Sequence, residues 1–597
     1  MALGPARAGA LALLAAAALA GWRVAHALEA LETPVDRHGA PFVGSRACAR
    51  CHGDHQASWE ASHHRRMTQE AREGAVLGAF DGSTLAYGGY LATMDRSAEG
   101  AFQVTLRRMD DEAPSAAGVP AEPADAIASG SRSRTTPAEI TRWTVERVVG
   151  SRRHQQLLAR EDDLWVRLPI AWDVEEGRWM HMNGAFLTSD PEGLDGEAPI
   201  AFADYMRHAV RWNDNCVFCH NVGAEPRPRD DGHWDTRVAE LGVACEACHG
   251  PGGEHARTNA DPFRRYVLHE TGRADPTITA PTRLSAERAT DVCGRCHGQR
   301  ITADVGRYLA HGDPFVPGDD LADTSHPLAI DTPLHGDASA FAPRFWPDGT
   351  ARLTAYEQQG VLQDRCDAAC GDCHAMHDYA SPRGQLRADL EGDALCTQCH
   401  ESLAGESAAQ AHARHEGVAC VDCHMPRIVY GIRTIHRSHR IEIPHPLAQS
   451  EGGRPDACTL CHVDRSVAWA ERGIGAADER HDAGGRARME ELIFGGDPIE
   501  RAVAAAALGR ALGERGAPSA SGWLVAAMRD DPYPAVRGIA WRSVSAARGL
   551  PASAFRSTDA RAARVAALEA LGLRAVTPAD VDALRARADE RAIEIGE

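Results

Sequence analysis

Residues 243–249 read VACEACH, and residues 418–424 read VACVDCH. Both stretches contain the pentapeptide Cys-x-x-Cys-His. Eight copies, beginning at Cys48, Cys216, Cys245, Cys293, Cys370, Cys396, Cys420 and Cys458, use sixteen of the seventeen cysteines in the 597-residue chain. In this pentapeptide the two thiols form thioethers with the vinyl groups of a haem, and the adjacent histidine reaches the iron. The sequence therefore predicts eight covalently bound haem c groups and, with them, redox chemistry.

The motifs name the expected attachment residues and iron ligands. The attachment cysteines are Cys48, Cys51, Cys216, Cys219, Cys245, Cys248, Cys293, Cys296, Cys370, Cys373, Cys396, Cys399, Cys420, Cys423, Cys458 and Cys461. The proximal ligands are His52, His220, His249, His297, His374, His400, His424 and His462. A zinc site or a redox dithiol is the alternative for Cys-x-x-Cys alone. Zinc would suit the ribbon-like spacing of Cys396, Cys399, Cys420 and Cys423, but neither alternative explains the histidine that ends every motif.

The first 27 residues have the pattern of an export signal. Arg7 precedes an apolar run from Ala8 to Trp22, and Ala25-His26-Ala27 fits a small-residue cleavage site. The run is shorter than the about 20 residues that a membrane span needs. We therefore expect a signal peptide over 1–27, no transmembrane span and a soluble protein in the periplasm or otherwise exported. An uncleaved anchor is the alternative.

The charge of the chain bears on its partners. The formal net charge is −20, and all 64 basic residues are arginine. A strongly acidic chain is an unsuitable partner for nucleic acid, whereas periplasmic redox proteins with basic faces are plausible donors and acceptors. The absence of lysine excludes a lysine-ligated catalytic haem of the kind found in ammonia-forming nitrite reductases and tetrathionate-reducing octahaem enzymes.

The spacing of the motifs predicts the domains up to residue 470. Residues 28–70 form a first haem module, and residues 71–205 form a β-containing insert. Within the insert, alternating apolar residues at 102–107 and 164–170 indicate strands, and 111–138 reads as a loop. Residues 206–470 form a seven-haem core, with helices expected at 237–246 and 285–292 before two of the motifs and a long loop at 311–350.

The C-terminal region, residues 471–597, contains no cysteine. Asp-Pro pairs at 497–498 and 531–532 precede stretches with helical apolar spacing, which is a typical helix start. Repeated short helices favour a HEAT-like α-solenoid, with an ordinary helical bundle as the alternative. The predicted fold class is mainly α with little regular secondary structure around a stack of eight haems, plus the β-containing insert and the solenoid.

Twenty-one histidines lie outside the motifs, and several lie close to them. A second histidine on an iron makes a low-spin centre suited to electron transfer, whereas an open position suits catalysis. The density near the motifs favours two histidines on most irons. The histidines concerned are His63, His64, His255, His377, His412, His415, His436, His439 and His445.

Several segments resemble known multihaem cytochromes. VGSRACARCHGDHQASWEASHHRRM at 43–67 resembles the N-terminal module of cytochromes related to the tetrahaem cytochromes of ammonia oxidisers. The segments VACEACHGPGGEH, CGDCHAMH, GVACVDCHMP, HRSHRIEIPHP and DACTLCHVDRSVAWA are similar to the core of a bacterial multihaem family, some members of which end in TPR or HEAT repeats. Here DPIERAVAAAALGRAL and DDPYPAVRGIAWRSV look HEAT-like.

The resemblance implies an exported electron-transfer protein. It also implies that His64, His255, His377, His415 and His439 are distal ligands or lie beside a haem. The chain has CHAMH where the family often has CHDPH, and His377 is retained.

Two functions follow from these observations. The first is an electron conduit, with the helical tail docking a redox partner. The second is a multihaem oxidoreductase that acts on a small nitrogen or sulfur compound at one five-coordinate iron. For that case Arg152, Arg153, His154, Trp179 and His181 of the insert are the residues expected to line a pocket; an ordinary β domain that shields a haem face is the alternative that the sequence favours. Cys366, outside every motif, is expected to be a buried thiol; an intermolecular disulfide or a haem sulfur ligand is the alternative.

Overall fold

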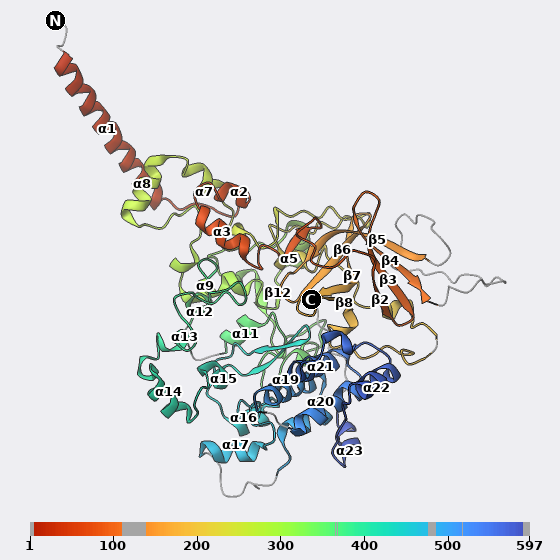
Figure 1. Cartoon of the computed structure of the whole chain (residues 1–597). Coiled ribbons are helices and arrows are strands. Elements are labelled where there is room, and N and C mark those ends of the chain that lie inside the picture. Colours follow the sequence, from red (N-terminus) through yellow and green to blue (C-terminus); the bar gives the residue numbers. More distant parts are fainter. Residues whose placement is uncertain are drawn as a thin grey trace.

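The computed structural model describes residues 5–109, 139–196, 198–363, 366, 368–475, 485–515 and 518–588. The loop expected at 111–138 lies outside these residues. A long N-terminal helix projects from the body, the β-sheet lies on one side of the body, and the C-terminal helices pack beneath the sheet (Figure 1). The motif-bearing segments fill the remaining side.

The N-terminal part contains α1 (Pro5–Glu32), α2 (Ser45–Cys48) and α3 (Gly53–Ala61). The sheet contains β1 (Thr68–Glu70), β2 (Ser83–Tyr87), β3 (Tyr90–Arg96), β4 (Phe102–Arg108), β5 (Glu139–Val149), β6 (His154–Glu161), β7 (Leu164–Asp173), β8 (Arg178–His181) and β9 (Val210–Arg211). The C-terminal part contains α18 (Arg488–Gly495), α19 (Pro498–Arg515), α20 (Pro518–Asp530), α21 (Pro534–Arg548), η7 (Ala552–Ala554), α22 (Arg561–Ala570) and α23 (Val581–Arg585).

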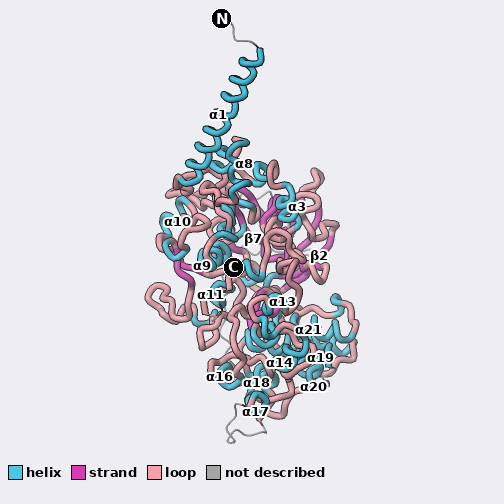
Figure 2. The backbone as a smooth tube through the Cα atoms, turned by 90° about the vertical axis from the view of Figure 1, so that its left-hand side faces the viewer, coloured by secondary structure: helices cyan, strands magenta, loops and turns pink. Residues whose placement is uncertain are grey.

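The elements between sheet and C-terminal part are short and are separated by long loops (Figure 2). They are η2 (Met182–Gly184), α4 (Phe202–Tyr205), α5 (Val217–His220), β10 (Asn221–Val222), β11 (Glu240–Leu241), α6 (Cys245–His249), α7 (Gly253–Thr258), α8 (Pro262–Thr271), η3 (Pro281–Arg283), α9 (Ala286–Gly294), β12 (Arg300–Thr302), α10 (Val305–His311), η4 (Leu321–Asp323), β13 (Ser325–Pro327), η5 (Ala342–Arg344), α11 (Glu357–Val361), α12 (Cys370–Cys373), α13 (Ala394–Thr397), η6 (Glu401–Leu403), α14 (Glu406–Ala413), α15 (Cys420–His424), β14 (Arg427–Gly431), β15 (Thr434–Arg437), α16 (Pro446–Glu451) and α17 (Val467–Ile474).

The sheet is antiparallel and nine-stranded, in the order β2-β3-β4-β5-β6-β7-β8, with β1 added to β5 and β9 added to β7. The outer strands β2 and β8 approach each other, so the sheet is nearly closed. Alternate residues of β4, including Phe102, Val104 and Leu106, are buried in one apolar core with Leu168 and Ile170 of β7. The period-two patterns thus correspond to real strands, and the fold is mixed α/β rather than mainly α.

The C-terminal helices begin where the sequence predicts. Asp497 precedes α19, and its Oδ1 accepts hydrogen bonds from the backbone N–H groups of Ile499 and Glu500, both at 2.9 Å. Glu500 closes the reciprocal bond by accepting from the Asp497 N–H at 2.8 Å. Such a cap satisfies N–H groups that a helix start leaves unpaired. The HEAT-like arrangement of these helices stays a prediction.

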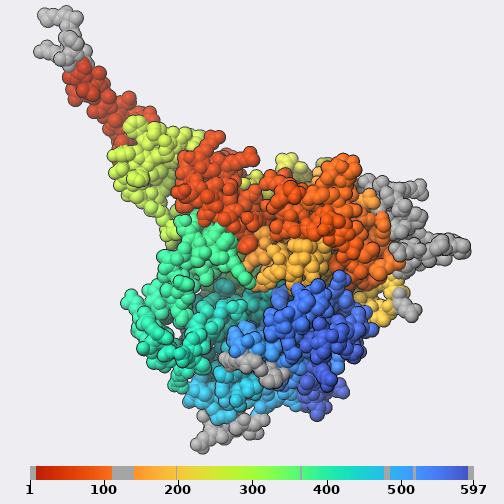
Figure 3. Space-filling model, viewed as in Figure 1, coloured from red at the N-terminus to blue at the C-terminus, as the bar shows by residue number. Residues whose placement is uncertain are grey.

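The C-terminal helices share a hydrophobic core with the middle of the chain. Val503 of α19 and Val536 of α21 belong to the same buried cluster as Ile428 of β14 and Trp346, all with no exposed surface. Trp346 lies in the segment 311–350, which the sequence suggested to be a loop around the haems. That segment does have little regular structure, but its Phe341, Phe345 and Trp346 are buried in the same cluster as the C-terminal helices, which pack on the body (Figure 3).

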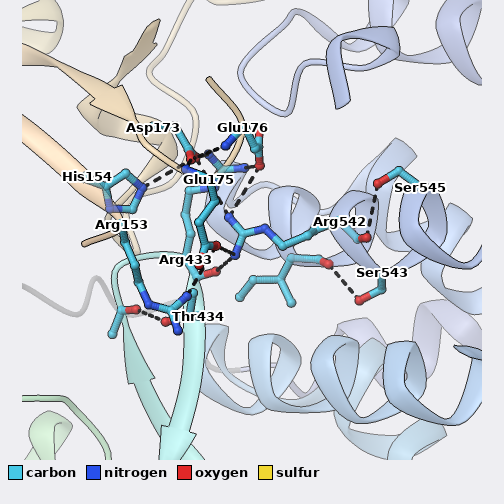
Figure 4. A network of polar contacts seen from close by, with 12 residues as sticks. Arg153, His154, Asp173, Glu175, Glu176, Arg433, Thr434, Arg542, Ser543 and Ser545 are labelled. Atoms are coloured by element: carbon cyan, nitrogen blue, oxygen red, sulfur yellow. Dashed lines mark hydrogen bonds and ion pairs between the residues drawn. The ribbon is translucent and has the colours of Figure 1, made fainter. Parts of the chain in front are cut away.

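Buried charges join the sheet, the β14–β15 hairpin and α21 (Figure 4). Arg433, in the hairpin turn, is 2% exposed and donates to Asp173 at 3.0 Å and to Glu176 at 2.9 Å. Arg542 of α21 also donates to Glu176, at 3.4 Å. Burial would raise the pKa of Asp173, but His154 and Arg433 outweigh it and hold that pKa well below its ordinary value. The carboxylates are therefore charged in the interior and depend on their arginines.

Replacing Arg433 should destabilise the whole body. Arg433→Met leaves the buried carboxylates of Asp173 and Glu176 without their main partner, which costs about 3–5 kcal/mol. The measurement is denaturant-induced unfolding of the haem-loaded protein. The control is Arg229→Met, which breaks an exposed pair with Asp231 and should cost less than about 1 kcal/mol. Equal losses for the two variants would contradict this account.

Candidate haem-binding site

Each motif forms a single helical turn. In the first motif the N–H of His52 donates to the Cys48 carbonyl at 3.0 Å, and in the last the N–H of His462 donates to the Cys458 carbonyl at 2.8 Å. One turn brings the first cysteine and the histidine to the same side of the backbone. Helix α9 begins after Ser285, as predicted, and contains the first cysteine of its motif. The helix expected at 237–246 is wrong: residues 240–241 pair in a strand, and the helix begins at Cys245.

Six motif histidines each face a second histidine from a distant or neighbouring segment. Their ring centroids lie 6.0–6.4 Å apart. The pairs are His52 with His255 (6.3 Å), His249 with His377 (6.3 Å), His297 with His64 (6.2 Å), His374 with His439 (6.4 Å), His424 with His412 (6.0 Å) and His462 with His415 (6.1 Å).

This separation fits a metal between the two rings. Two imidazoles that each bind one metal through a nitrogen at about 2.0 Å place their centroids roughly 6 Å apart. The residues present therefore suit an iron with a histidine on each side. His55 also lies 6.1 Å from His52. Only two residues, Gly53 and Asp54, lie between those two, so the chain from one to the other spans at most about 10 Å, which is too short to pass around the edge of a porphyrin.

The structure brings all five predicted distal histidines opposite motif histidines: His64, His255, His377, His415 and His439. Their ligand roles stay predictions. His412 is the sixth partner; the sequence marked it only as one of two histidines that precede the seventh motif. It lies on α14, three residues before His415, and nothing in the local sequence tells which motif histidine each of the two would face.

In several of the paired histidines, a hydrogen-bond acceptor lies beside the ring nitrogen Nδ1. Backbone carbonyls lie beside Nδ1 of His249 (Thr279, 2.7 Å), His374 (Gly384, 2.8 Å), His424 (Glu442, 2.7 Å) and His415 (Ala413, 2.7 Å). The Asp275 carboxylate lies 3.1 Å from Nδ1 of His255. Metal-binding histidines commonly donate the other ring N–H in this way, which fixes the ring and leaves Nε2 for the metal.

Glu357 holds Nδ1 of His297 at 3.6 Å. Its carboxylate raises the pKa of His297 to about 9 against the effect of burial, whereas burial and, after it, the charge of His297 lower the pKa of the facing His64 to about 4. His64 is thus neutral and able to bind a metal. If His297 bound a metal, its Nδ1–H would donate a hydrogen bond to the Glu357 carboxylate. That bond would make the ring a stronger electron donor to the metal.

Within the described residues, no facing histidine pair includes His220 or His400. The Nδ1 atom of His220 is buried and has no hydrogen-bond partner. Burial and, after it, the Arg167 guanidinium lower the pKa of His220 to about 4. His400 is exposed. The two remaining motifs therefore differ from the other six and from each other.

Sulfur contacts connect the motifs into a line. Hydrogen bonds join Cys48 to Cys245, Cys219 to Cys296, Cys293 to Cys370 and Cys396 to Cys420. Electrostatic interactions also join Cys248 to Cys296, Cys373 to Cys396 and Cys423 to Cys461. In motif numbers the hydrogen bonds join 1 to 3, 2 to 4, 4 to 5 and 6 to 7, and the electrostatic interactions relate 3 to 4, 5 to 6 and 7 to 8. Together they give the order 1–3–4–5–6–7–8, with motif 2 as a side branch on motif 4.

Other expected chemistry is absent from the described part of the chain. No three His, Cys, Asp or Glu side chains converge there to hold a bare metal ion, so zinc at Cys396, Cys399, Cys420 and Cys423 has no geometric support. None of the motif cysteines forms a disulfide. Cys366 is half-buried and interacts electrostatically with Cys373 and Cys396.

The five insert residues expected to line a pocket are not gathered in one. Arg153 and His154 belong to the buried charge network, at 3.6 Å from Glu175 and 3.7 Å from Asp173. Trp179 packs on Phe80, and His181 stacks on Tyr87 at 4.1 Å inside the sheet domain. Arg152 is exposed and lies near Arg383 and Glu175.

Comparison with known proteins agrees with the cysteines and histidines of the motifs as the side chains that bind haem. The cytochrome c552 family matches residues 406–494, and the family of cytochrome c554 and c-prime matches residues 196–250. Each match contains two of the motifs. The multiheme cytochrome MtrA of Shewanella baltica (strain OS185) is 23% identical over 242 residues, which are 40% of this chain and 52% of that protein. The chain thus spans about half the length of this curated relative.

A crystal structure of the outer cell wall cytochrome OcwA aligns with 89% of this chain and 99% of its own, at 18% identity and a TM-score of 0.45. The family matches and the relative together support a multihaem cytochrome with covalently bound haem c.

The Glu357 carboxylate beside His297 should set the reduction potential of one iron. Glu357→Gln removes the negative charge beside the ring and weakens it as a donor to Fe(III), so one reduction potential should rise. A tenfold change in the one-electron equilibrium corresponds to about 59 mV, which is the size expected. The measurement is a spectroelectrochemical titration of the haem-loaded protein. Glu99→Gln, in the β3–β4 turn, is the control and should leave every potential unchanged; an unchanged titration in Glu357→Gln would contradict the assignment.

Proposed function

We propose that this chain is an exported octahaem electron-transfer protein in which most irons have two histidine ligands. The six facing histidine pairs are the observation that carries the proposal. Bound haem c supplies a one-electron iron couple at each motif. The chain supplies the ligands, their orientation and the charge around them. The distal ligands proposed are His255, His377, His64, His439, His412 and His415.

The sulfur contacts support a continuous path between the motifs. The two cysteines of a motif hold the edge of a macrocycle, because thioethers form at its vinyl groups. Cysteines of neighbouring motifs that touch would therefore hold two such edges together. Such contacts join motif 1 to 3, 2 to 4, 4 to 5 and 6 to 7, and electrostatic interactions between cysteines relate the pairs 3–4, 5–6 and 7–8, so each motif has a neighbour in the line.

Charges beside two motif histidines favour one direction of electron transfer at the branch between motif 4 and motif 2. Glu357 beside His297 stabilises the oxidised, more positive state at motif 4, and Arg167 beside His220 stabilises the reduced state at motif 2. Electrons would then move from motif 4 toward motif 2. A periplasmic donor and an acceptor are the proposed partners, and the C-terminal helices are the proposed docking region for one of them.

A second function is favoured by one observation at motif 2. His220 has no facing histidine among the described residues, and its motif ends a branch beneath the sheet domain. An iron held there on one side only could bind a small nitrogen or sulfur compound. In that case the chain would be an oxidoreductase whose other motifs deliver electrons to the branch.

Removal of one distal histidine tests the first function. His415 is exposed, so His415→Ala should leave the fold intact and convert the iron at His462 from low-spin to high-spin. Low-temperature EPR should gain a high-spin signal of about one iron in eight, and added imidazole should remove it. His269→Ala, another exposed histidine away from the motifs, is the control. A spectrum identical to the control would overturn the ligand assignment.

The spin states of the unmodified protein test the second function. Six low-spin irons and a high-spin component from the motifs of His220 and His400 are expected in the oxidised protein. Cys216→Ala with Cys219→Ala should remove about one haem in eight together with the part of that signal that nitrite or sulfite shifts. If nitrite and sulfite leave the spectrum of the unmodified protein unchanged, the catalytic proposal fails and the conduit remains.

A further inference from the structure

Helix α1 continues past the predicted cleavage site. It runs without a break to Glu32, five residues beyond Ala27, which is 6% exposed. Ala27 and Leu31 form a small apolar core with Val267 of α8, and Val24 and Leu28 pack against the same core. The last turns of α1 are thus part of the folded body.

Polar contacts on both sides of Ala27 reinforce this junction. Arg23 donates to Asp261 at 2.8 Å and lies over the Phe263 ring at 5.1 Å. Glu32, at the end of the helix, accepts from Arg273 at 2.9 Å. Arg23, Val24 and Ala27 all precede the predicted cut, so cleavage after Ala27 would discard side chains that make specific contacts.

The remainder of α1 is apolar and projects away from the body, as two views at right angles agree (Figures 1 and 2). Among the described helices, the segment Gly9–Glu32 is the one long and apolar enough to cross a membrane, with a hydropathy of 1.6 and 6% of its most apolar stretch buried. Leu13 and Leu14 are 74% and 68% exposed. Such a surface is unfavourable in water and favourable in lipid.

The base of this projection has the residues of a membrane interface. Trp22 is 60% exposed, and Tyr266 on the adjacent α8 is 58% exposed. Tryptophan and tyrosine gather where lipid meets water, and arginines at the ends of an apolar helix extend its reach by snorkelling. Arg7 and Arg23 flank the uncharged run 8–22, which is about 22 Å long as a helix, somewhat shorter than a bilayer core.

We propose that α1 is a retained membrane anchor, with a lipid bilayer around its apolar part and α8 lying at the membrane surface. The orientation of the body follows from the contacts of α8. Arg264 of α8 pairs with Asp275 at 2.7 Å, and Asp275 holds His255, which faces His52. On the proposed function, the first motif is therefore the end of the electron path nearest the membrane.

The first experiment finds where the mature chain begins. The full-length chain is expressed with haem maturation, and its N-terminal peptide is identified by mass spectrometry in membrane and soluble fractions. We expect residues before Ala27 to be present, the protein to stay in membranes through an alkaline carbonate wash, and detergent to release it. A soluble protein that begins at Leu28, or release by carbonate alone, would overturn the anchor.

A matched variant separates retention from failed cleavage. Ala25 is exposed, so Ala25→Phe leaves the α8 contacts intact but blocks the small-residue position that a signal peptidase requires. The anchor predicts the same membrane-bound yield for the variant and the parent. Conversion of a soluble parent into a membrane-bound variant would identify a cleaved signal. Haem absorbance is read in parallel, because an anchored chain without haem would overturn the proposed function and leave the anchor standing.

The ion pair at the junction gives a second test. Arg23→Glu should speed limited proteolysis of the connection at 33–44 by about two- to fivefold, because that is the effect expected from the loss of a half-exposed ion pair. The double variant Arg23→Glu with Asp261→Arg reverses the pair and should restore the parent rate. If α1 were removed in maturation, Arg23→Glu would leave the rate of the mature protein unchanged, and that result would overturn the proposal.

Discussion

The facing of histidine rings from separate segments of the chain is the constraint on which the rest of this structure depends. Each facing pair joins a motif histidine to a histidine from elsewhere in the chain, as when His64 from the N-terminal part meets His297 from the middle. The facing pairs bring separate segments together, as packed helices do in other proteins. Much of the motif-bearing region can therefore be loop. The regular structure lies at its borders, in the sheet and in the C-terminal helices.

Local structure could be predicted where adjacent residues determine it, as where Asp497 followed by proline starts a helix. The pentapeptide predicts haem attachment and proximal ligation in the same local way, and these roles stay predictions. Alternation at 102–107 and 164–170 gave two strands of a nine-stranded sheet. The size of the sheet was underestimated because strands such as β5 and β6 have fewer apolar residues in alternation, and their partners are set by long-range pairing.

Tertiary partners could not be predicted. His412 and His415 are three residues apart, yet they face different motif histidines, His424 and His462. The pocket expected in the insert failed for a similar reason. Arg153 and His154 carry the residue types of a reactive site, but carboxylates from the β7–β8 turn neutralise them. Only the placement of Glu175 and Asp173 distinguishes a structural ion pair from a catalytic group.

The carbonyl acceptors beside His249, His374, His424 and His415 have an evolutionary consequence. A backbone carbonyl is present whatever side chain its residue carries, so substitutions at Thr279, Gly384, Glu442 or Ala413 do not remove the acceptor. The loops that orient these rings can therefore diverge freely in sequence as long as their path is kept. Weak sequence identity between such proteins is then compatible with the same coordination, because what is inherited is the course of the main chain.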